Sequence, residues 1–452
     1  MLSPFQRRLP GLLLAALAIL WFTARVAAQA PPEPYAAINR DAVNYAGPGR
    51  ETAHDLAGTE VRIGLLVPLQ GPRQAEGEAL LQAAQLAIED AAANPLPAGR
   101  RLALATRDES GPWGRASSEI VRLVFDDQAV ALVTSLEGGA AHLAEQIGNK
   151  IGVPVLTLSS DKTTTQINLP WIFRLGPTDA AQARAFTQNI YRERGLKSVV
   201  LVTENDHDGR VGGEEFLKAA RDFTARDSGA EDTSGFAPRE SNAPAPVRMV
   251  IESVLADLDA IVKGITRQKP EALVLWTGHE AAATLVARVR DETPSVPIYL
   301  CRKAAQESFE DFTGGHCRPC SSDRVAAGVA PTSRPADGVA ATLRPAGSSA
   351  SPRSNADDAG IWVVASPARG TADRESFERR YRQRTGSTPS LAAAQAYDAV
   401  RIVAAALRYS GPNRARLRDS LAELSGFPGV SGMICFDHAG NDTTPVALVR
   451  TH

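Results

Sequence analysis

The sequence predicts an α/β protein of two doubly wound, Rossmann-like lobes, each with a mainly parallel sheet between layers of helices. Three observations predict this fold. Short strand-forming runs alternate with longer helical segments from residue 61 onward. The strands are apolar throughout, as expected for strands that are buried on both faces of a parallel sheet. The alternation starts again near residue 177, which indicates a second lobe of the same plan.

The first lobe begins with a strand at 61–67, "VRIGLLV", which is apolar after Arg62. A helix at 76–94 follows, because its apolar residues recur at spacings of three and four and so share one face. The elements expected after it are strands at 101–106, 130–134, 153–158 and 171–175, and helices at 116–127 and 140–152.

The second lobe begins with a helix at 178–195 and a strand at 198–203. Its further elements are helices at 211–223, 257–268 and 279–292, and strands at 247–252, 271–276 and 296–300. In open parallel sheets a ligand binds beyond the carboxyl ends of the strands, where helix N-termini offer free N–H groups. The segments expected at these ends are 68–71, 135–139, 159–161, 204–209 and 277–279.

The first 30 residues have the three-part pattern of a secretory signal peptide. Arg7 and Arg8 form a basic start, "GLLLAALAILWF" is an apolar core, and the small residues of "AQA" end at Ala30. The apolar run is shorter than the roughly 20 residues that span a bilayer. We therefore expect removal after Ala30, a periplasmic mature protein without stable membrane insertion, and an extended arm at 31–59.

The charge balance and the absence of motifs narrow the function. Removal of the signal peptide takes away three arginines and no acid, which leaves 46 Lys and Arg against 51 Asp and Glu, a formal charge of −5. This balance gives no support for nucleic-acid binding, which needs a basic face. The sequence has no serine-nucleophile, zinc-protease or phosphate-binding loop motif, and its seven histidines are scattered. We expect a protein that is not an enzyme and holds no cofactor or metal ion.

Residues 313–356 break the pattern. They are dense in Ala, Ser, Pro, Gly and Arg and lack apolar periodicity, which predicts a disordered insertion; a reading-frame error in the source sequence would give the same composition. Cys317 and Cys320, in "HCRPC", are expected to form a disulfide in an oxidising compartment, or to pair with Cys301. A redox role would need a helix after the pair to activate a thiolate, and none is expected there.

Six short stretches occur in order between residues 63 and 441: "IGLLVPLQG", "AQLAIEDA", "IGVPVLTLS", "WIFRLGPTD", "STPSLAAAQAYDAV" and "GMICFDHAGN". In this order they resemble the type I periplasmic solute-binding proteins of the leucine/isoleucine/valine-binding family. The resemblance implies two lobes joined by three crossovers, with a small polar ligand clamped between them by hinge closure. Lobe one would comprise 60–176 and 357–427, and lobe two 177–312 and 428–452. It also implies an inner-membrane permease of an ATP-driven (ABC) importer as the partner.

The resemblance also indicates where a ligand binds. The family's amino-acid ligand meets hydroxyls and backbone groups at two strand ends of lobe one, and lobe two adds side chains from across the cleft. Together with the end of the first strand, the candidate ligand-binding residues are Gln70, Gly138, Gly139, Ser159, Ser160, Asp161, Asp208 and His279.

Several candidates depart from the family's pattern. Gly138 stands where a serine is usual, and Asp161 where a threonine is usual. Glu137 and Asp161 would repel a free α-carboxylate in a closing cleft. We therefore expect a neutral polar, hydroxylated or cationic solute rather than a branched-chain amino acid.

Other interpretations stay open. The chain could be the ligand-sensing component of a signalling system, or a thiol–disulfide redox protein that uses Cys317 and Cys320. The candidate site residues also have structural alternatives. Ser159 and Ser160 would serve equally as turn caps, and Asp161 as an ion-pair partner of Lys162 or Arg174.

Overall fold

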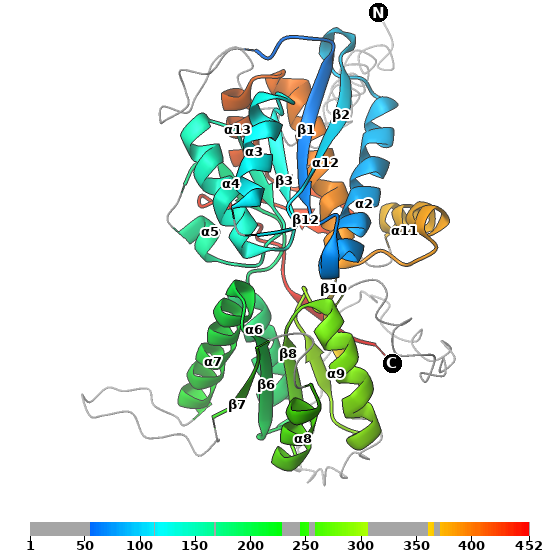
Figure 1. Ribbon diagram of the computed structural model, residues 1–452. Coiled ribbons are helices and arrows are strands. Elements are labelled where there is room, and N and C mark those ends of the chain that lie inside the picture. The colour runs from blue at the N-terminus through cyan, green and yellow to red at the C-terminus, as the bar shows by residue number, and fades with distance from the viewer. Residues whose placement is uncertain are drawn as a thin grey trace, which may run out of the picture.

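The computed structural model describes residues 55–112, 114–166, 169–227, 245–252, 258–305, 360–365 and 371–451. Within these ranges the chain forms two lobes, one above the other in Figure 1, each with its own sheet. Both sheets are mainly parallel and packed against helices, which confirms the predicted fold class. Over the same ranges, no helix combines the length and the apolar character that crossing a membrane requires.

The first sheet has five parallel strands in the order β2-β1-β3-β4-β5. Neighbouring side chains of a strand point to opposite faces. Leu65 therefore packs with the helices at 74–92 and 391–410, while Leu66 packs with those at 115–125 and 138–151. The strands are β1 (Glu60–Val67), β2 (Arg101–Asp108), β3 (Ala131–Thr134), β4 (Val155–Thr157) and β5 (Ile172–Arg174). The helices are α2 (Gln74–Ala92), α3 (Arg115–Phe125), α4 (Gly138–Ile151), α5 (Thr163–Gln166), α11 (Ala372–Thr385), α12 (Leu391–Ser410) and α13 (Arg414–Ala422).

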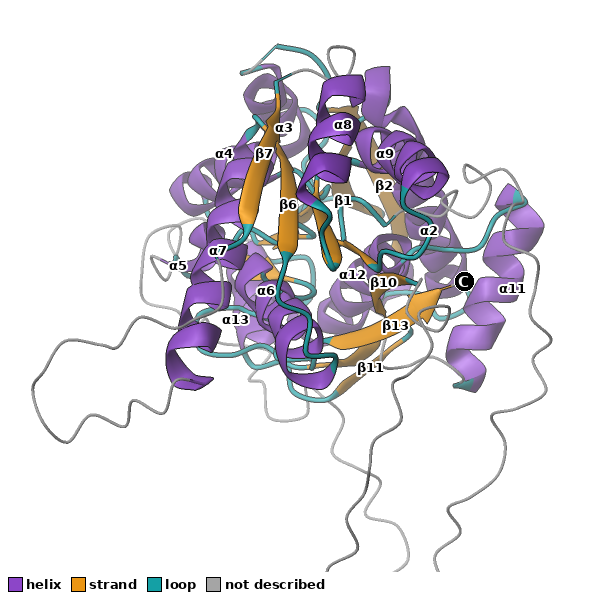
Figure 2. Ribbon diagram, turned by 90° about the horizontal axis from the view of Figure 1, so that it is seen from below, coloured by secondary structure: helices purple, strands orange, loops and turns teal. Residues whose placement is uncertain are grey.

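The second sheet has six strands in the order β13-β10-β9-β8-β6-β7, of which only β13 is antiparallel to its neighbour. Seen from below, α6 and α7 lie on one side of this sheet and α8 and α9 on the other (Figure 2). The strands are β6 (Val199–Glu204), β7 (Val247–Ile251), β8 (Ala272–Trp276), β9 (Ile298–Leu300), β10 (Ile361–Ala365) and β13 (Ala447–Thr451). The helices are α6 (Asp179–Thr187), which continues as a π-helical turn at Gln188–Glu193, α7 (His207–Asp227), α8 (Leu258–Gln268) and α9 (His279–Glu292).

The expected lobe boundaries need correction at two places. The sequence assigns 357–427 to lobe one, but β10 pairs with β9 and β13 in the second sheet. It assigns 428–452 to lobe two, but a hairpin of β11 (Phe427–Gly429) and β12 (Gly432–Ile434) packs into the core around α12. An apolar strand fits either sheet equally well, so its pattern alone does not choose between them.

Asp398 on α12 fixes this hairpin to the first lobe. Its buried carboxylate accepts hydrogen bonds from the N–H groups of Val430 (3.0 Å) and Ser431 (2.8 Å) and from the Ser431 hydroxyl (2.6 Å). With the hairpin in the first lobe, the chain passes between the lobes three times: after β5, between β10 and α11, and between β12 and β13. The three predicted crossovers are therefore present.

Arg302 packs at the junction of the lobes. Its guanidinium is buried and donates to Gln395 Oε1 of α12 (2.6 Å) and to the Leu175 carbonyl (3.3 Å). Gly176, on the first crossover, has a φ of 94°, and a Cβ there would lie 2.2 Å from Gln395 Nε2 and 2.3 Å from Arg302 Nη1. Only glycine leaves room for the guanidinium to reach across the junction.

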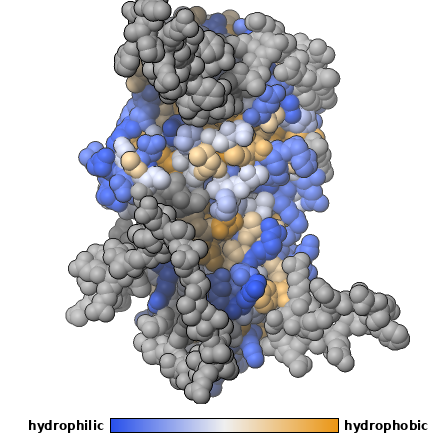
Figure 3. All heavy atoms as spheres, turned by 180° about the vertical axis from the view of Figure 1, so that it is seen from behind, coloured by the Kyte–Doolittle hydropathy of each residue, from blue (hydrophilic) through white to orange (hydrophobic). Residues whose placement is uncertain are grey.

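The surface of the described residues is mainly polar. From behind, hydrophilic residues cover much of it and hydrophobic residues form small groups (Figure 3). The exposed large apolar side chains fall on α3, β7 and the β12 strand: Val121, Phe125, Val247, Val250 and Met433. Most of the large apolar side chains are therefore used in the cores of the two lobes.

Candidate ligand-binding cleft

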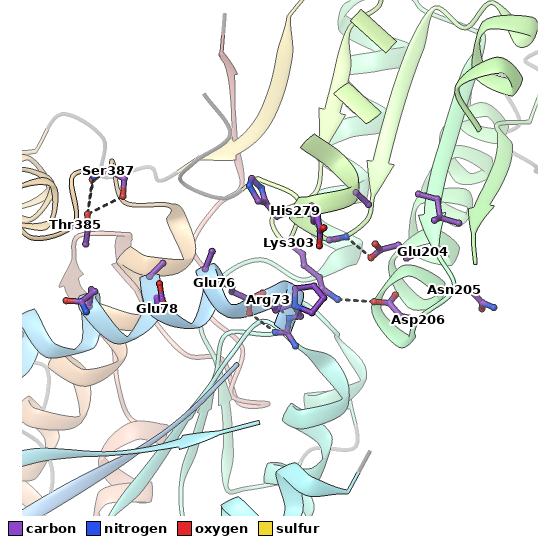
Figure 4. A pocket seen from close by; sticks show the side chains of 18 of the residues that line it. Arg73, Glu76, Glu78, Glu204, Asn205, Asp206, His279, Lys303, Thr385 and Ser387 are labelled. Carbon is purple, nitrogen blue, oxygen red and sulfur yellow. Dashed lines mark hydrogen bonds and ion pairs between the residues drawn. The ribbon is translucent and has the colours of Figure 1, made fainter. Parts of the chain in front are cut away.

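A cleft of about 820 Å³ lies between the two lobes. It is walled by the start of α2, by α11, by the carboxyl ends of β6 and β7, and by the N-terminus of α9. Figure 4 shows Arg73 and Glu76 at the start of α2 opposite Glu204, Asp206 and Lys303 of the second lobe. Strand ends and helix N-termini of both lobes meet here, which is where open parallel sheets place their ligands.

On the side of the first lobe, Arg73 carries the positive charge of the cleft. Its guanidinium forms ion pairs with Glu76 (2.7 Å) and Glu109 (3.1 Å) and donates a hydrogen bond to the Ser135 hydroxyl (3.2 Å). Glu109 is buried and itself accepts from Ser135 (2.6 Å). Arg73 is therefore already engaged by two acids of its own lobe.

On the side of the second lobe, Lys303 holds a similar position. Its ammonium lies 2.6 Å from Asp208 Oδ2 and 3.1 Å from Asp206 Oδ2. Burial alone would lower the pKa of Lys303, but the charges of Asp208 and Asp206 outweigh it and hold that pKa above its ordinary value. The ammonium therefore stays charged and is shared between two carboxylates.

His279, at the start of α9, lines the cleft as a neutral imidazole. Burial lowers its pKa, although its hydrogen bond to the Ala304 carbonyl (3.0 Å from Nδ1) opposes this. The bond to a carbonyl requires the proton on Nδ1, which leaves Nε2 as an acceptor.

The lining of the cleft is acidic. Six carboxylates face three cationic side chains: Glu76, Glu78, Glu204, Asp206, Glu252 and Glu280 against Arg73, Lys303 and Arg384. Burial also raises the pKa of Glu204, whose carboxylate accepts from the Gly278 N–H (2.8 Å) just before α9. An acidic, partly desolvated lining favours a neutral or positively charged ligand over an anion.

The lobes touch at the N-terminus of α4. Asp208 of the second lobe accepts a hydrogen bond from the Gly138 N–H (3.0 Å), and Glu137 accepts from the Ala140 N–H (2.7 Å). A Cβ at position 138 would lie 2.6 Å from Asp208 Oδ1, so glycine permits this approach. Two of the N–H groups at this helix N-terminus, those of Gly138 and Ala140, are thus occupied by the protein's own carboxylates.

Next to this contact, three side chains from three elements converge. Oδ2 of Asp161, in the loop after β4, lies 3.1 Å from Nε2 of His142 on α4 and 2.6 Å from Nε2 of His207 at the start of α7. Glu145 Oε2 lies 3.0 Å from His142 Nδ1. We call His142, Asp161 and His207 the lobe-junction triad, since His207 belongs to the second lobe and the other two to the first.

The structure separates the predicted site residues into three groups. His279 lines the cleft, and Ser160 and Asp208 line a small cavity of about 10 Å³ beside Lys303. Gly138, Asp161 and Asp208 form contacts between the lobes, as described above, while Gly139 follows Gly138 in the first turn of α4. Gln70 Nε2 donates to Asp108 (3.0 Å), and Ser159 is fully buried, its hydroxyl accepting from the Asp161 N–H. Ligand contact by these eight residues remains a prediction.

Asp161 lies in the contact between the lobes. Its carboxylate is 1% exposed and is paired with two histidines, which lower its pKa although burial opposes them. The repulsion expected between Asp161 and a ligand carboxylate is therefore small. The argument against an anionic ligand therefore rests on the acidic lining of the cleft and on the carboxylates at the helix N-termini.

Several residues that line the cleft were not among the candidates selected from the sequence. Lys303 follows the carboxyl end of β9, and Arg73 directly precedes α2. The expectation that ligands bind beyond the carboxyl ends of the strands, here called the strand-end rule, would have found both residues if it had been extended to these positions. Glu204 and Asp206 lie in a segment that the rule did select. Cys317 and Cys320 lie outside the described residues. Of the cysteines inside them, Cys301 and Cys435 form no disulfide.

The lobe-junction triad predicts that the stability of the protein depends on pH. Hydrogen bonds to Asp161 and Glu145 raise the pKa of His142 from 6.5 to about 9, and Asp161 raises that of His207, with Asp208 also facing it. A raised pKa stabilises the folded state fully below the unfolded value of about 6.5, and this stabilisation is lost as the pH rises toward 9. We expect the free energy of unfolding to fall by about 1–2 kcal/mol between pH 6 and pH 9.5, with allowance for solvent screening.

Urea denaturation at both pH values in the presence of a chelator measures this difference. The double variant His142→Gln, His207→Gln is the control and should lose the part that the triad contributes. Burial raises the pKa of Glu109 to about 8 and that of Asp179 to about 7, so these acids should keep a remaining fall of stability in the variant. An equal pH dependence in the variant and the parent would show that other groups are responsible.

Comparison with known proteins gives a consistent assignment. A family model described as periplasmic binding protein matches residues 60–292 and 334–451. No curated protein matches the chain in sequence at the required significance.

Among solved structures the chain resembles several binding proteins. A leucine-binding protein of Thermotoga maritima has a TM-score of 0.65 at 17% identity, over 86% of this chain and 94% of that one. A branched-chain amino acid binding protein of Streptococcus pneumoniae, in complex with isoleucine, has a TM-score of 0.65 at 19% identity, over 87% and 100%. A solute-binding protein of Rhodopseudomonas palustris, in complex with 3,4-dihydroxybenzoic acid, has a TM-score of 0.65 at 15% identity, over 87% and 93%. At these identities the likeness shows a shared fold.

Proposed function

The chain belongs to the periplasmic binding protein family, and from this premise we propose that it captures a small polar solute between its lobes and delivers it to an ABC importer. Export to the periplasm and transfer to an inner-membrane permease are parts of this proposal. The interlobe cleft of about 820 Å³ supports it, because that volume falls in the range of small-molecule sites.

We further propose that the solute is neutral or cationic. The observation that carries this is the acidic lining of the cleft, where Glu204 also occupies the Gly278 N–H at the start of α9. Isoleucine and 3,4-dihydroxybenzoic acid, the ligands in two similar structures, each carry a carboxylate. In this chain such a group would have to displace an internal carboxylate and enter a cleft with twice as many acids as cations.

Matched ligand pairs test the charge of the solute. Thermal shift and isothermal titration would compare leucinamide with leucine, benzamidine with benzoate, and agmatine with arginine. A ligand at 100 times its Kd stabilises the folded state by about 2.7 kcal/mol, which such assays detect readily. We expect binding only among the members without a carboxylate. Tight binding of leucine or benzoate would overturn the ligand class.

Variants locate the binding. Glu76→Gln and Asp206→Asn should each weaken a cationic ligand by about tenfold or more, because each removes a charge that faces the cleft. Asp222→Asn, an exposed position on α7 away from the cleft lining, is the matched control and should leave the affinity unchanged. Equal affinities in all three variants would place the ligand elsewhere.

A further inference from the structure

The lobe-junction triad brings three metal-binding groups to one point. Two imidazoles and one carboxylate offer ligand atoms that all lie within 4.8 Å of one another. The three residues stand 19 and 46 positions apart in the chain and come from α4, the loop after β4 and the start of α7. We propose that His142, Asp161 and His207 form a Zn²⁺ site that joins the two lobes. The ion would act as a bridge and not as the transported solute, so the proposal is independent of the ligand class given above.

The donor set suits zinc. Zn²⁺ binds histidine nitrogen and carboxylate oxygen in four-coordinate sites, and a site with three protein ligands keeps its fourth position for water or another oxygen. Thr163 Oγ1, 2.8 Å from His142 Nε2, is an oxygen in the immediate neighbourhood. Ca²⁺ and Mg²⁺ prefer sites built of oxygen alone, so two imidazoles disfavour them.

The geometry needs only a small adjustment. Zinc–ligand bonds of about 2.0–2.2 Å at tetrahedral angles place neighbouring ligand atoms about 3.4 Å apart. The separations from Asp161 Oδ2 are 3.1 Å to His142 and 2.6 Å to His207. The His207 nitrogen must therefore move about 0.8 Å away from Asp161 Oδ2, while the ligand atoms of the two histidines already lie within 4.8 Å of each other; the His207 side chain is 36% exposed.

The surroundings orient the ligands as known zinc sites do. Glu145 is 3% exposed and accepts a hydrogen bond from the Nδ1–H of His142. This leaves the Nε2 lone pair directed toward Asp161. A carboxylate behind a ligating histidine is the usual arrangement around zinc. Asp161 Oδ1 accepts from the Thr163 N–H (2.9 Å) and hydroxyl (2.7 Å), which fixes the carboxylate and leaves Oδ2 for the shared position.

A bound ion would favour the closed arrangement of the lobes. His207 is the contribution of the second lobe, and its neighbour Asp208 makes the hydrogen bond to Gly138 across the same junction. Opening the cleft separates His207 from the other two ligands, so Zn²⁺ binds the closed form more tightly and shifts the equilibrium toward it.

Zinc titration of the full chain tests the site. The protein used for the titration carries no polyhistidine tag. It bears Cys317→Ser and Cys320→Ser, so that "HCRPC" contributes no thiolate. We expect one Zn²⁺ per chain by calorimetry, and with Co²⁺ the intense visible absorption of a four-coordinate site. Small-angle scattering without solute should show a smaller radius of gyration with Zn²⁺, reversed by a chelator.

Variants of the triad and of Glu145 test whether zinc binds at this site. His142→Gln or His207→Gln should abolish the cobalt spectrum, and Glu145→Gln should weaken zinc about 10–100-fold, as expected for a supporting carboxylate. His438→Gln, at an exposed histidine outside the triad, should bind as the parent does. Circular dichroism confirms that each variant is folded. Absence of zinc binding in the parent, or unchanged binding in both triad variants, would overturn the proposal. Neither result bears on solute binding, which is measured in the presence of a chelator.

Discussion

Replacing Arg174 with alanine is expected to lower the free energy of unfolding by about 3–5 kcal/mol, the usual loss when one partner of a buried charged network is removed. The guanidinium is 1% exposed and donates to the Asp161 carbonyl (2.8 Å), the Thr165 hydroxyl (2.8 Å) and Asn441. These acceptors belong to three segments: the loop after β4, α5, and the crossover before β13. Without the guanidinium they stay buried and lose their donor, which costs about 1–3 kcal/mol for each group.

Urea denaturation at pH 7 measures the loss. Burial lowers the pKa of Arg174 to about 10, so the side chain is charged under these conditions. Arg174→Met keeps most of the volume and should lose nearly as much stability as the alanine variant, because the polar contacts are missing in both. Arg101→Ala, at a side chain that is 77% exposed, is the control and should change stability by less than about 0.5 kcal/mol. Recovery of the parent stability by methionine would show that packing, and not hydrogen bonding, explains the effect.

Gly77→Ala is expected to destabilise the protein by about 2–4 kcal/mol, although alanine is the better helix former by about 1 kcal/mol. Gly77 lies in the first turn of α2, where a Cβ would be 1.7 Å from the carbonyl oxygen of Pro68 and 2.6 Å from its carbon. Both atoms are backbone, so the helix itself must move away from the end of β1. Arg73 and Glu76 move with it, and we expect solute binding at the cleft to weaken as well.

Gly264→Ala in α8 is the matched control. The atoms that a Cβ would meet there are the flexible end of Met249, at 3.2 Å and 3.3 Å, and these can give way. The propensity gain should then dominate, so the two variants are expected to shift the midpoint of urea denaturation in opposite directions. A neutral or stabilising Gly77→Ala would mean that α2 adjusts freely against β1.

The fold could be predicted because its signals are local. The apolar strand at 61–67 and the striped helix at 76–94 correspond to β1 and α2 within two residues at each end. The affiliation of β10 could not be predicted in this way, since pairing with β9 is a contact between distant parts of the chain. The same holds for the hairpin that Asp398 anchors.

Part of the candidate site could also be predicted, because the signals for it are local in the sequence. The strand-end rule selected the segments of Glu204, Asp206 and His279, because a parallel sheet fixes the edge at which its strands end. It also selected the segments of Asp161 and His207, but not His142, the third member of the lobe-junction triad. His142 lies in the second turn of α4, and its proximity to Asp161 and His207 depends on how the two lobes face each other. No periodicity in the sequence encodes that orientation.

The path of the chain through the second sheet sets the order in which the molecule can fold. β10 and β13 are hydrogen-bonded neighbours, yet the chain between them builds α11, α12 and α13 of the other lobe. Such sequence-distant pairings give a high contact order and slow folding. The edge strand β13 ends at Thr451, and α12 and α13 must be present before the first core closes. The first lobe therefore stays incomplete until the hairpin of β11 and β12 is present, and the second until β13 is present.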